Sequence, residues 1–230
     1  MASVIRTNSW LGVTDEDPWT ESFDGTDGDC LCVVIDQISG WGGDHTPVKY
    51  DGVTMTEVIR TIQPSNNRRS IWYLTSPGTG SNTIEVTLQN VSTYPSMVMA
   101  AILMTGVDQD TPVRTVITAF DASMSEHQLT ETESANGDVL VGVYLSGATA
   151  GPPTDGDAWV PEAGTVEFCD HYHDADNGQV YMGCVYREAE GASATVNDTA
   201  DINSQLGSSL LTFIASTGGQ NILTLRHEGY

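Results

Sequence analysis

The chain has 230 residues, 39% of them apolar, so one large β domain or two small domains could bury a core without disulfide or metal staples. Only 17% of the residues are charged, yet 31 are Asp or Glu and 8 are Lys or Arg, a net charge of −23. This imbalance excludes nucleic acids and acidic membrane surfaces as expected partners, because both are bound through Lys and Arg side chains.

The acidic excess itself has two interpretations. It could keep the protein soluble in concentrated salt, where screening limits the self-repulsion to a few Å, and the composition resembles that of halophilic proteins. Alternatively, Asp and Glu oxygens could bind divalent cations such as calcium. Because the acids are scattered along the chain rather than clustered, we favour salt adaptation.

The N-terminal residues, MASVIRTNSW, lack the apolar stretch of a signal peptide. We therefore expect a protein that is made and folded in the cytoplasm. Residues 1–22 are interpreted as a possible N-terminal arm. Two tryptophans, Trp10 and Trp19, lie in this segment.

Alternation of apolar and polar side chains with period two recurs along the chain, and helical periodicity is nearly absent. In Thr83–Leu88, for example, Ile84, Val86 and Leu88 share one face of a strand. The other predicted strands are Cys30–Ile38, Gly52–Ile62, Ser70–Thr75, Asp138–Leu145, Thr165–His173, Gln179–Arg187, Ser208–Ala215 and Asn221–His227.

The segment Ser96–Thr105, SMVMAAILMT, has apolar residues between its polar ends, so a strand here would be apolar on both faces. It could be a strand buried on both faces or a short buried helix. Its flanks, Tyr94-Pro95 and Gly106, favour the strand.

Two long segments, Ser146–Ala163 and Glu188–Gln205, lack strand character and are predicted to be loops. Neither has the composition of an interdomain linker, so we predict a single domain over residues 1–230. About a dozen short strands separated by Gly-rich turns predict an all-β fold, an antiparallel β-sandwich of jelly-roll type.

Two of the predicted strands begin with a weakly similar sequence. GDCLCVVI at Gly28–Ile35 and GDVLVGVYL at Gly137–Leu145 are both a Gly-Asp turn leading into an apolar strand. This similarity indicates two sheets with a similar arrangement of strands, and it does not by itself establish a sequence repeat.

One hairpin carries a possible zinc site. Asn177-Gly178 predicts a type I′ turn, which would place His171 opposite Cys184. Cys169, His171 and His173 alternate along the preceding strand and share its face, so with Cys184 they would present zinc ligands. The alternative is a face of thiols and imidazoles that packs against another sheet or a partner subunit.

Catalytic signatures are absent from the sequence. It has no G-x-S-x-G, no H-E-x-x-H and no G-x-x-x-x-G-K motif. The Asp-rich segments Asp24–Asp29 and Asp174–Gly178 lack the terminal Glu of an EF-hand loop and are interpreted as turns. We therefore expect no enzyme and no resident cofactor, apart from the zinc or calcium considered above.

Tryptophans in loops are the candidates for an interaction surface. Trp41 lies in the sequence Gly40-Trp-Gly-Gly43, and Trp159 lies in the second half of a long loop. Together with Trp10 and Trp19 they could anchor a protein interface or stack on sugars. The alternative is that they close the open ends of the sandwich.

The order of several motifs resembles a known family. Pro47–Thr56 (PVKYDGVTMT), Ser70–Leu88 (SIWYLTSPGTGSNTIEVTL) and Met104–Pro112 (MTGVDQDTP) occur in this order. The pattern resembles jelly-roll domains common among structural proteins of tailed viruses and in environmental bacterial sequences. With the N-terminal GDCLCVVI and the C-terminal LLTFIAS and ILTLRHE strands, the resemblance covers about Ser3–Tyr230.

The resemblance implies a role in a virus particle. Such domains are typically capsid decoration (cement) proteins, tail or fibre parts, or lectin-like modules. We therefore expect a decoration protein, made in the host cytoplasm, that binds the major capsid protein on the virion surface as a homotrimer. The alternatives are a carbohydrate-binding or receptor-recognition module of a tail, spike or turret and, third, a glycan-active enzyme.

Overall fold

A computed structural model describes residues 1–13, 17–38, 44–62, 67–89, 96–147, 159–161, 163–175 and 178–216. Strands and turns account for all the regular structure in these ranges, and the strands pack in antiparallel sheets. The predicted all-β fold of stacked antiparallel sheets is therefore confirmed. None of these residues belongs to a helix long and apolar enough to cross a membrane.

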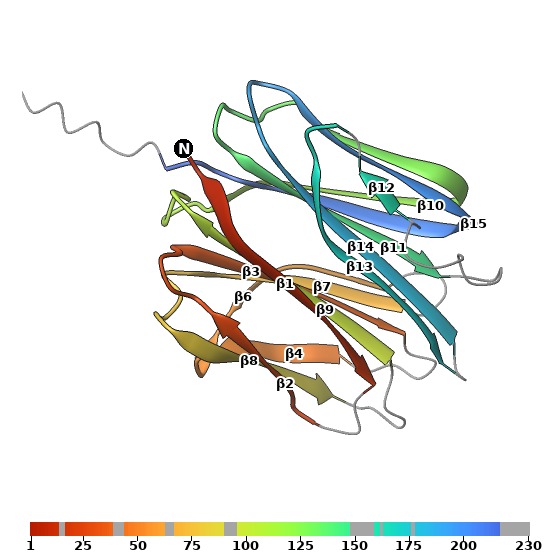
Figure 1. The fold of residues 1–230 in the computed structure, drawn as a ribbon, viewed down its shortest axis with the longest axis horizontal. Helices are drawn as coiled ribbons and strands as arrows, with labels where there is room; N and C mark the ends of the chain where they lie inside the picture. The colour runs from red at the N-terminus through yellow and green to blue at the C-terminus, as the bar shows by residue number, and fades with distance from the viewer. Residues whose placement is uncertain are drawn as a thin grey trace, which may run out of the picture.

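Two sheets are built from the first half of the chain (Figure 1). The middle sheet has the strand order β1-β9-β3-β7-β6, and the outer sheet has the order β2-β8-β4-β5. Their bounds are β1 Ser3–Val13, β2 Trp19–Asp24, β3 Cys30–Ile38, β4 Asp44–Tyr50, β5 Val53–Thr54, β6 Thr56–Ile62, β7 Asn67–Thr75, β8 Ser81–Gln89 and β9 Ser96–Thr105.

The second half of the chain forms the C-terminal sheet, which packs on the other face of the middle sheet. Its strand order is β10-β15-β11-β14-β13, and β12 pairs with β15 beside this path. The bounds are β10 Val113–Glu131, β11 Val139–Gly147, β12 Trp159–Pro161, β13 Val166–Ala175, β14 Gly178–Glu188 and β15 Ala194–Phe213.

The central strands of the middle sheet are buried on both faces. Every residue of Met97–Met104 in β9 is 0% exposed, as is every residue of Cys30–Gln37 in β3. One face packs on the outer sheet around Trp72 and Ile84, and the other packs on the C-terminal sheet around Ile102 and Leu211. The prediction that Ser96–Thr105 is a strand buried on both sides is confirmed.

In the first half, the strand pairs are nested. β1 pairs with β9, β2 with β8, β3 with β7, and β4 with β5. Successive pairs alternate between the middle sheet and the outer sheet. The first half is therefore one long antiparallel hairpin that is rolled into two facing sheets.

The second half uses the same nesting, although two of its strands fold back on themselves. The start of β10 pairs with the end of β15, and the end of β10 pairs with the start of β15. Thr115 and Thr212, a cross-strand pair, both hydrogen-bond to Glu131 at the far end of β10. In a straight strand residues 115 and 131 would lie about 50 Å apart, so the ladder bends over itself (Figure 1). Leu129 and Val196 thereby cover the outer face of the C-terminal sheet.

The two halves also share their hydrogen bonding at equivalent places. Asp29 precedes β3, and its carboxylate accepts the backbone N–H of Gly106, 2.6 Å away, just after β9. Asp138 precedes β11, and its carboxylate accepts the N–H of Ala215, 2.8 Å away, just after β15. The two similar Gly-Asp sequences, before β3 and before β11, thus form equivalent turns in two similarly rolled halves.

Several predicted segments need correction. Residues 1–22 do not form an arm, because Ser3–Val13 is the edge strand β1 and Trp19 opens β2. Glu188–Gln205 is not a loop, since β15 begins at Ala194 and pairs with β10. Met55 divides the predicted strand Gly52–Ile62 into β5 and β6. The predicted strand Asn221–His227 lies outside the described residues.

Candidate functional site

The predicted interaction tryptophans lie in different environments. Trp10 is half-buried on β1, where its ring meets Phe23 edge to face with centroids 6.1 Å apart. Trp19 is only 3% exposed, and its indole N–H donates to Glu21. Trp159 begins β12, although its side chain lies outside what is described, as does all of Trp41. Trp19 therefore belongs to the core rather than to a surface.

The register of the predicted zinc hairpin differs from the expected one. Ala175 pairs with Gly178, so the register is shifted from the predicted one, in which Asp176 pairs with Gln179. As a result, His171 lies opposite Met182, and Cys184 lies opposite Cys169. The side chain of His173 is not described, and the described residues contain no group of three or more His, Cys, Asp or Glu side chains that could hold a metal ion.

The two thiols of this hairpin are buried in the core between the middle and C-terminal sheets. Cys169 is 2% exposed and Cys184 is 0% exposed. Burial raises the pKa of the Cys184 thiol well above its ordinary value, and a hydrogen bond with Cys169 raises it further. The Cys184 thiol is therefore held neutral, and both side chains are shielded from solvent.

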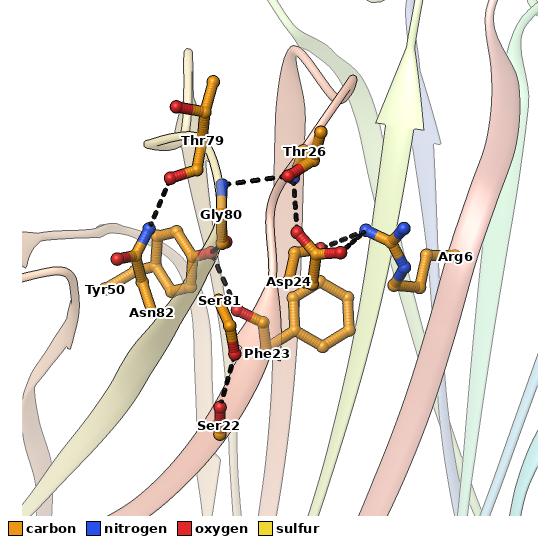
Figure 2. A network of polar contacts seen from close by, with 10 residues as sticks. All are labelled: Arg6, Ser22, Phe23, Asp24, Thr26, Tyr50, Thr79, Gly80, Ser81 and Asn82. Atoms are coloured by element: carbon orange, nitrogen blue, oxygen red, sulfur yellow. Dashed lines mark hydrogen bonds and ion pairs between the residues drawn. The ribbon is translucent and has the colours of Figure 1, made fainter.

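The acidic segment Asp24–Asp29 is a turn, as its sequence indicates. Asp24 accepts the backbone N–H of Thr26 at 3.0 Å and forms an ion pair with Arg6 at 3.2 Å (Figure 2). The Thr26 hydroxyl in turn accepts the N–H of Gly80 at 2.9 Å. Asp24 thus has its partners within the protein, where they join β1, β2 and the turn before β8.

The most unusual charged group in the described residues is Arg69 of β7, which is 0% exposed. Its guanidinium donates to the hydroxyl of Ser209 at 3.0 Å and to the backbone carbonyl of Gly207 at 3.1 Å, both in β15. A longer bond of 3.4 Å reaches the carbonyl of Val143 in β11. One buried side chain of the middle sheet therefore holds two strands of the C-terminal sheet.

The counter-charge of Arg69 is Asp36, its cross-strand neighbour on β3. The Nε atom of Arg69 lies 3.7 Å from a carboxylate oxygen of Asp36, an ion pair too long for a hydrogen bond, and neither oxygen of Asp36 has a hydrogen-bond partner. Burial raises the pKa of Asp36 to about 7, even though the charge of Arg69 opposes the rise.

A second buried polar group lies on the opposite face of the middle sheet. The Nδ1 atom of His45 in β4 is 2.9 Å from the hydroxyl of Ser70 in β7. Burial lowers the pKa of His45 to about 3, and the charges of Arg60 and Arg68 lower it further. His45 is therefore neutral at ordinary pH and joins the outer sheet to the middle sheet.

Asp36, Arg69 and His45 were not predicted from the sequence. Arg69 follows another arginine in Asn-Arg-Arg-Ser, which reads as a solvated surface stretch. A signal for Asp36 was available in the two polar residues, Asp36 and Gln37, that follow six apolar residues in the strand Cys30–Ile38.

The chain matches no protein-family model, and no curated protein or solved structure is similar to it at a significant level.

Proposed function

We propose that the chain is a virion structural protein, a capsid decoration protein that works by binding and not by catalysis. The observation that carries the proposal is the burial of five titratable side chains in the part of the chain that the structure describes. Asp36, Arg69, His45, Cys169 and Cys184 are all at most 2% exposed. They lie in the interior between sheets, out of reach of a substrate.

The nested strand pairs support the jelly-roll form of this fold. A jelly roll is a long antiparallel hairpin rolled into two facing sheets, and the nested pairs of β1–β9 and the back-folded pair of β10 and β15 are consistent with that form. The three motifs that resemble viral jelly-roll domains fall on β4–β5, on β7–β8 and just after β9. All three lie in the first half, and the second half carries the same pairing with a different sequence.

The proposed partner is the major capsid protein, which the protein would meet as a homotrimer on the shell surface. Symmetric positions on a lattice favour a symmetric oligomer. A ligand that binds the assembled shell and not its separate subunits stabilises the shell by mass action. A net charge of −23 suits a particle exposed to concentrated salt, where these charges are screened.

The direct test is binding to purified shells that carry the cognate capsid protein. We expect saturable co-sedimentation in molar salt at a fixed ratio to capsid subunits, and a solution mass by light scattering of three times the 24.6 kDa chain. Absence of saturable binding, or binding to a glycan array in place of shells, would reject the decoration role.

A single substitution tests the partner surface. We expect Trp159→Ala to weaken shell binding at least about tenfold, since buried interface tryptophans contribute about 2 kcal/mol or more. Val53→Ala, at a side chain 53% exposed on β5, is the control and should bind as the wild type does. Unchanged occupancy with Trp159→Ala would remove this residue from the partner surface.

A further inference from the structure

Two of the four cysteines face each other across a pair of neighbouring strands. Cys169 of β13 and Cys184 of β14 are direct partners in the antiparallel ladder, and the Cys169 thiol donates to the backbone carbonyl of Met182 on β14, 3.6 Å away. Opposite residues in such a ladder have Cα atoms about 4.5 or 5.5 Å apart. A disulfide bond spans Cα separations of about 4.4 to 6.8 Å, so it could join this pair with little movement of the backbone.

The first half of the chain provides an internal comparison. β6 pairs with β7 as β13 pairs with β14, and both pairs contain a bulge, between Glu57 and Ile59 and between Glu167 and Cys169. The residues equivalent to the two cysteines are therefore Ile59 and Ile71, which also lie opposite each other. Packing in this place is satisfied by two aliphatic side chains, so packing alone does not explain a thiol at both positions.

The other two cysteines lack this geometry. Cys30 and Cys32 alternate on one face of β3, so their Cα atoms lie about 6 to 7 Å apart along the strand, and they do not pair across strands. Their ladder partners are Thr75 and Tyr73 on one side and Met104 and Ile102 on the other.

We propose that Cys169 and Cys184 form a cross-strand disulfide when the protein meets a low-molecular-weight disulfide such as oxidised glutathione. The thiolate of one cysteine attacks the glutathione disulfide and releases one glutathione thiolate. The second cysteine attacks the mixed disulfide and releases the second. Two protein S–H bonds are replaced by one S–S bond, and the two electrons reduce the glutathione.

Because both thiols are buried, the bond can form only while the pair is exposed to the oxidant. The high pKa of Cys184 and the burial of both side chains make the pair unreactive in the closed fold. β13 is an edge strand of the C-terminal sheet, so its opening uncovers the pair without disrupting the middle sheet. The bond therefore forms during folding or edge opening in an oxidising medium, and it then ties β13 to β14. This inference does not depend on the proposed role in a capsid.

The test is to refold the full chain in a buffer of reduced and oxidised glutathione, and in reduced glutathione alone as control. Free thiols are then alkylated under denaturing conditions and the peptides are mapped by mass spectrometry. We expect two of the four thiols to be lost and a linked pair of peptides that carries Cys169 and Cys184. Cys30 and Cys32 should remain fully alkylated.

The double variant Cys169→Ile/Cys184→Ile copies the first half and is the matched control. The wild type should melt several degrees higher after oxidation than when reduced, while the variant should show no shift between the two buffers. Four free thiols after refolding in oxidant, or a bond that includes Cys30 or Cys32, would overturn the proposal. So would one bound zinc per chain in protein purified without chelator, if the substitution removes it.

Discussion

At the scale of single residues, the buried pair Asp36 and Arg69 connects the two halves of the chain. Arg69 satisfies backbone carbonyls of the opposite sheet, while Asp36 has no hydrogen bond to either oxygen. A buried carboxylate that accepts no hydrogen bond favours its protonated form. The stability of the protein should therefore depend on pH through Asp36.

The expected direction follows from the pKa of Asp36, which the fold raises from 3.8 to about 7. The stabilisation from the protonated acid is complete below pH 3.8 and is lost as the pH rises to about 7, by up to about 1.4 kcal/mol per pH unit. Asp36→Asn should remove this downward slope in urea-unfolding free energies measured at constant salt. The exposed control Asp110→Asn should keep it, and an unaltered slope in Asp36→Asn would contradict this account.

His45 should act in the opposite direction. Its pKa falls from 6.5 to about 3 in the folded state, so its contribution is complete above pH 6.5 and is lost as the pH falls toward 3. His45→Gln, which keeps a polar group for Ser70, should make unfolding less sensitive to acid between these limits. Urea midpoints at pH 4.5 and pH 7.5 measure the effect. A variant as acid-sensitive as the wild type would mean that His45 is not protected from protonation.

At the scale of elements, the turns before β3 and β11 are equivalent anchors. Asp29 accepts the N–H groups of Gly106 and Val107, and its own carbonyl accepts Ser76. Asp138 accepts the N–H groups of Ala135 and Ala215, and its carbonyl accepts Ala189. Each carboxylate therefore ties the start of a central strand to the segment that follows the last strand of its half.

We expect Asp29→Ala and Asp138→Ala to destabilise the protein by similar amounts, about 1 to 3 kcal/mol each, because each removes a charged acceptor from two part-buried backbone N–H groups. Asp110→Ala, at an exposed position in the turn before β10, should change the unfolding free energy by less than about 0.5 kcal/mol. Urea unfolding of the three variants provides the comparison. A large loss for only one of the two anchors would argue against their equivalence.

The sequence predicted elements best where one side-chain pattern decided the structure. The bounds of Cys30–Ile38 and Ser96–Thr105 are correct because both runs are apolar on both faces. β10 was missed because no simple alternation covers its 19 residues, which bend between Asp121 and Glu126. β15 was predicted only in its apolar end, since its polar start is a strand through pairing with β10.

The candidate site was less predictable for a physical reason. The same-face placement of Cys169 and His171 follows from alternation, but the partner of each depends on the register of the hairpin. The observed register differs from the predicted one, so Cys169 and not His171 is the cross-strand neighbour of Cys184. The role of Arg69 depends on a sheet formed more than 70 residues later, which no local pattern reveals.

At the scale of the whole molecule, the net charge of −23 makes the stability of the folded protein depend on the salt concentration. We expect the melting temperature to rise by several degrees between about 0.1 M and 2 M KCl, because the screening length falls from about 10 Å to less than 3 Å. Calcium at a few millimolar in 0.1 M KCl is the control. Full stabilisation by calcium alone would favour specific cation binding over salt adaptation.

The two halves pack through a shared core that includes Cys169 and Cys184. The measurement that tests the proposed binding role most directly is the heat stability of shells with and without the protein. In molar salt, shells that carry the protein should release their contents at a higher temperature than bare shells, and the difference should grow with the concentration of added protein until the sites are full. Identical release temperatures at saturating protein would contradict a decoration role.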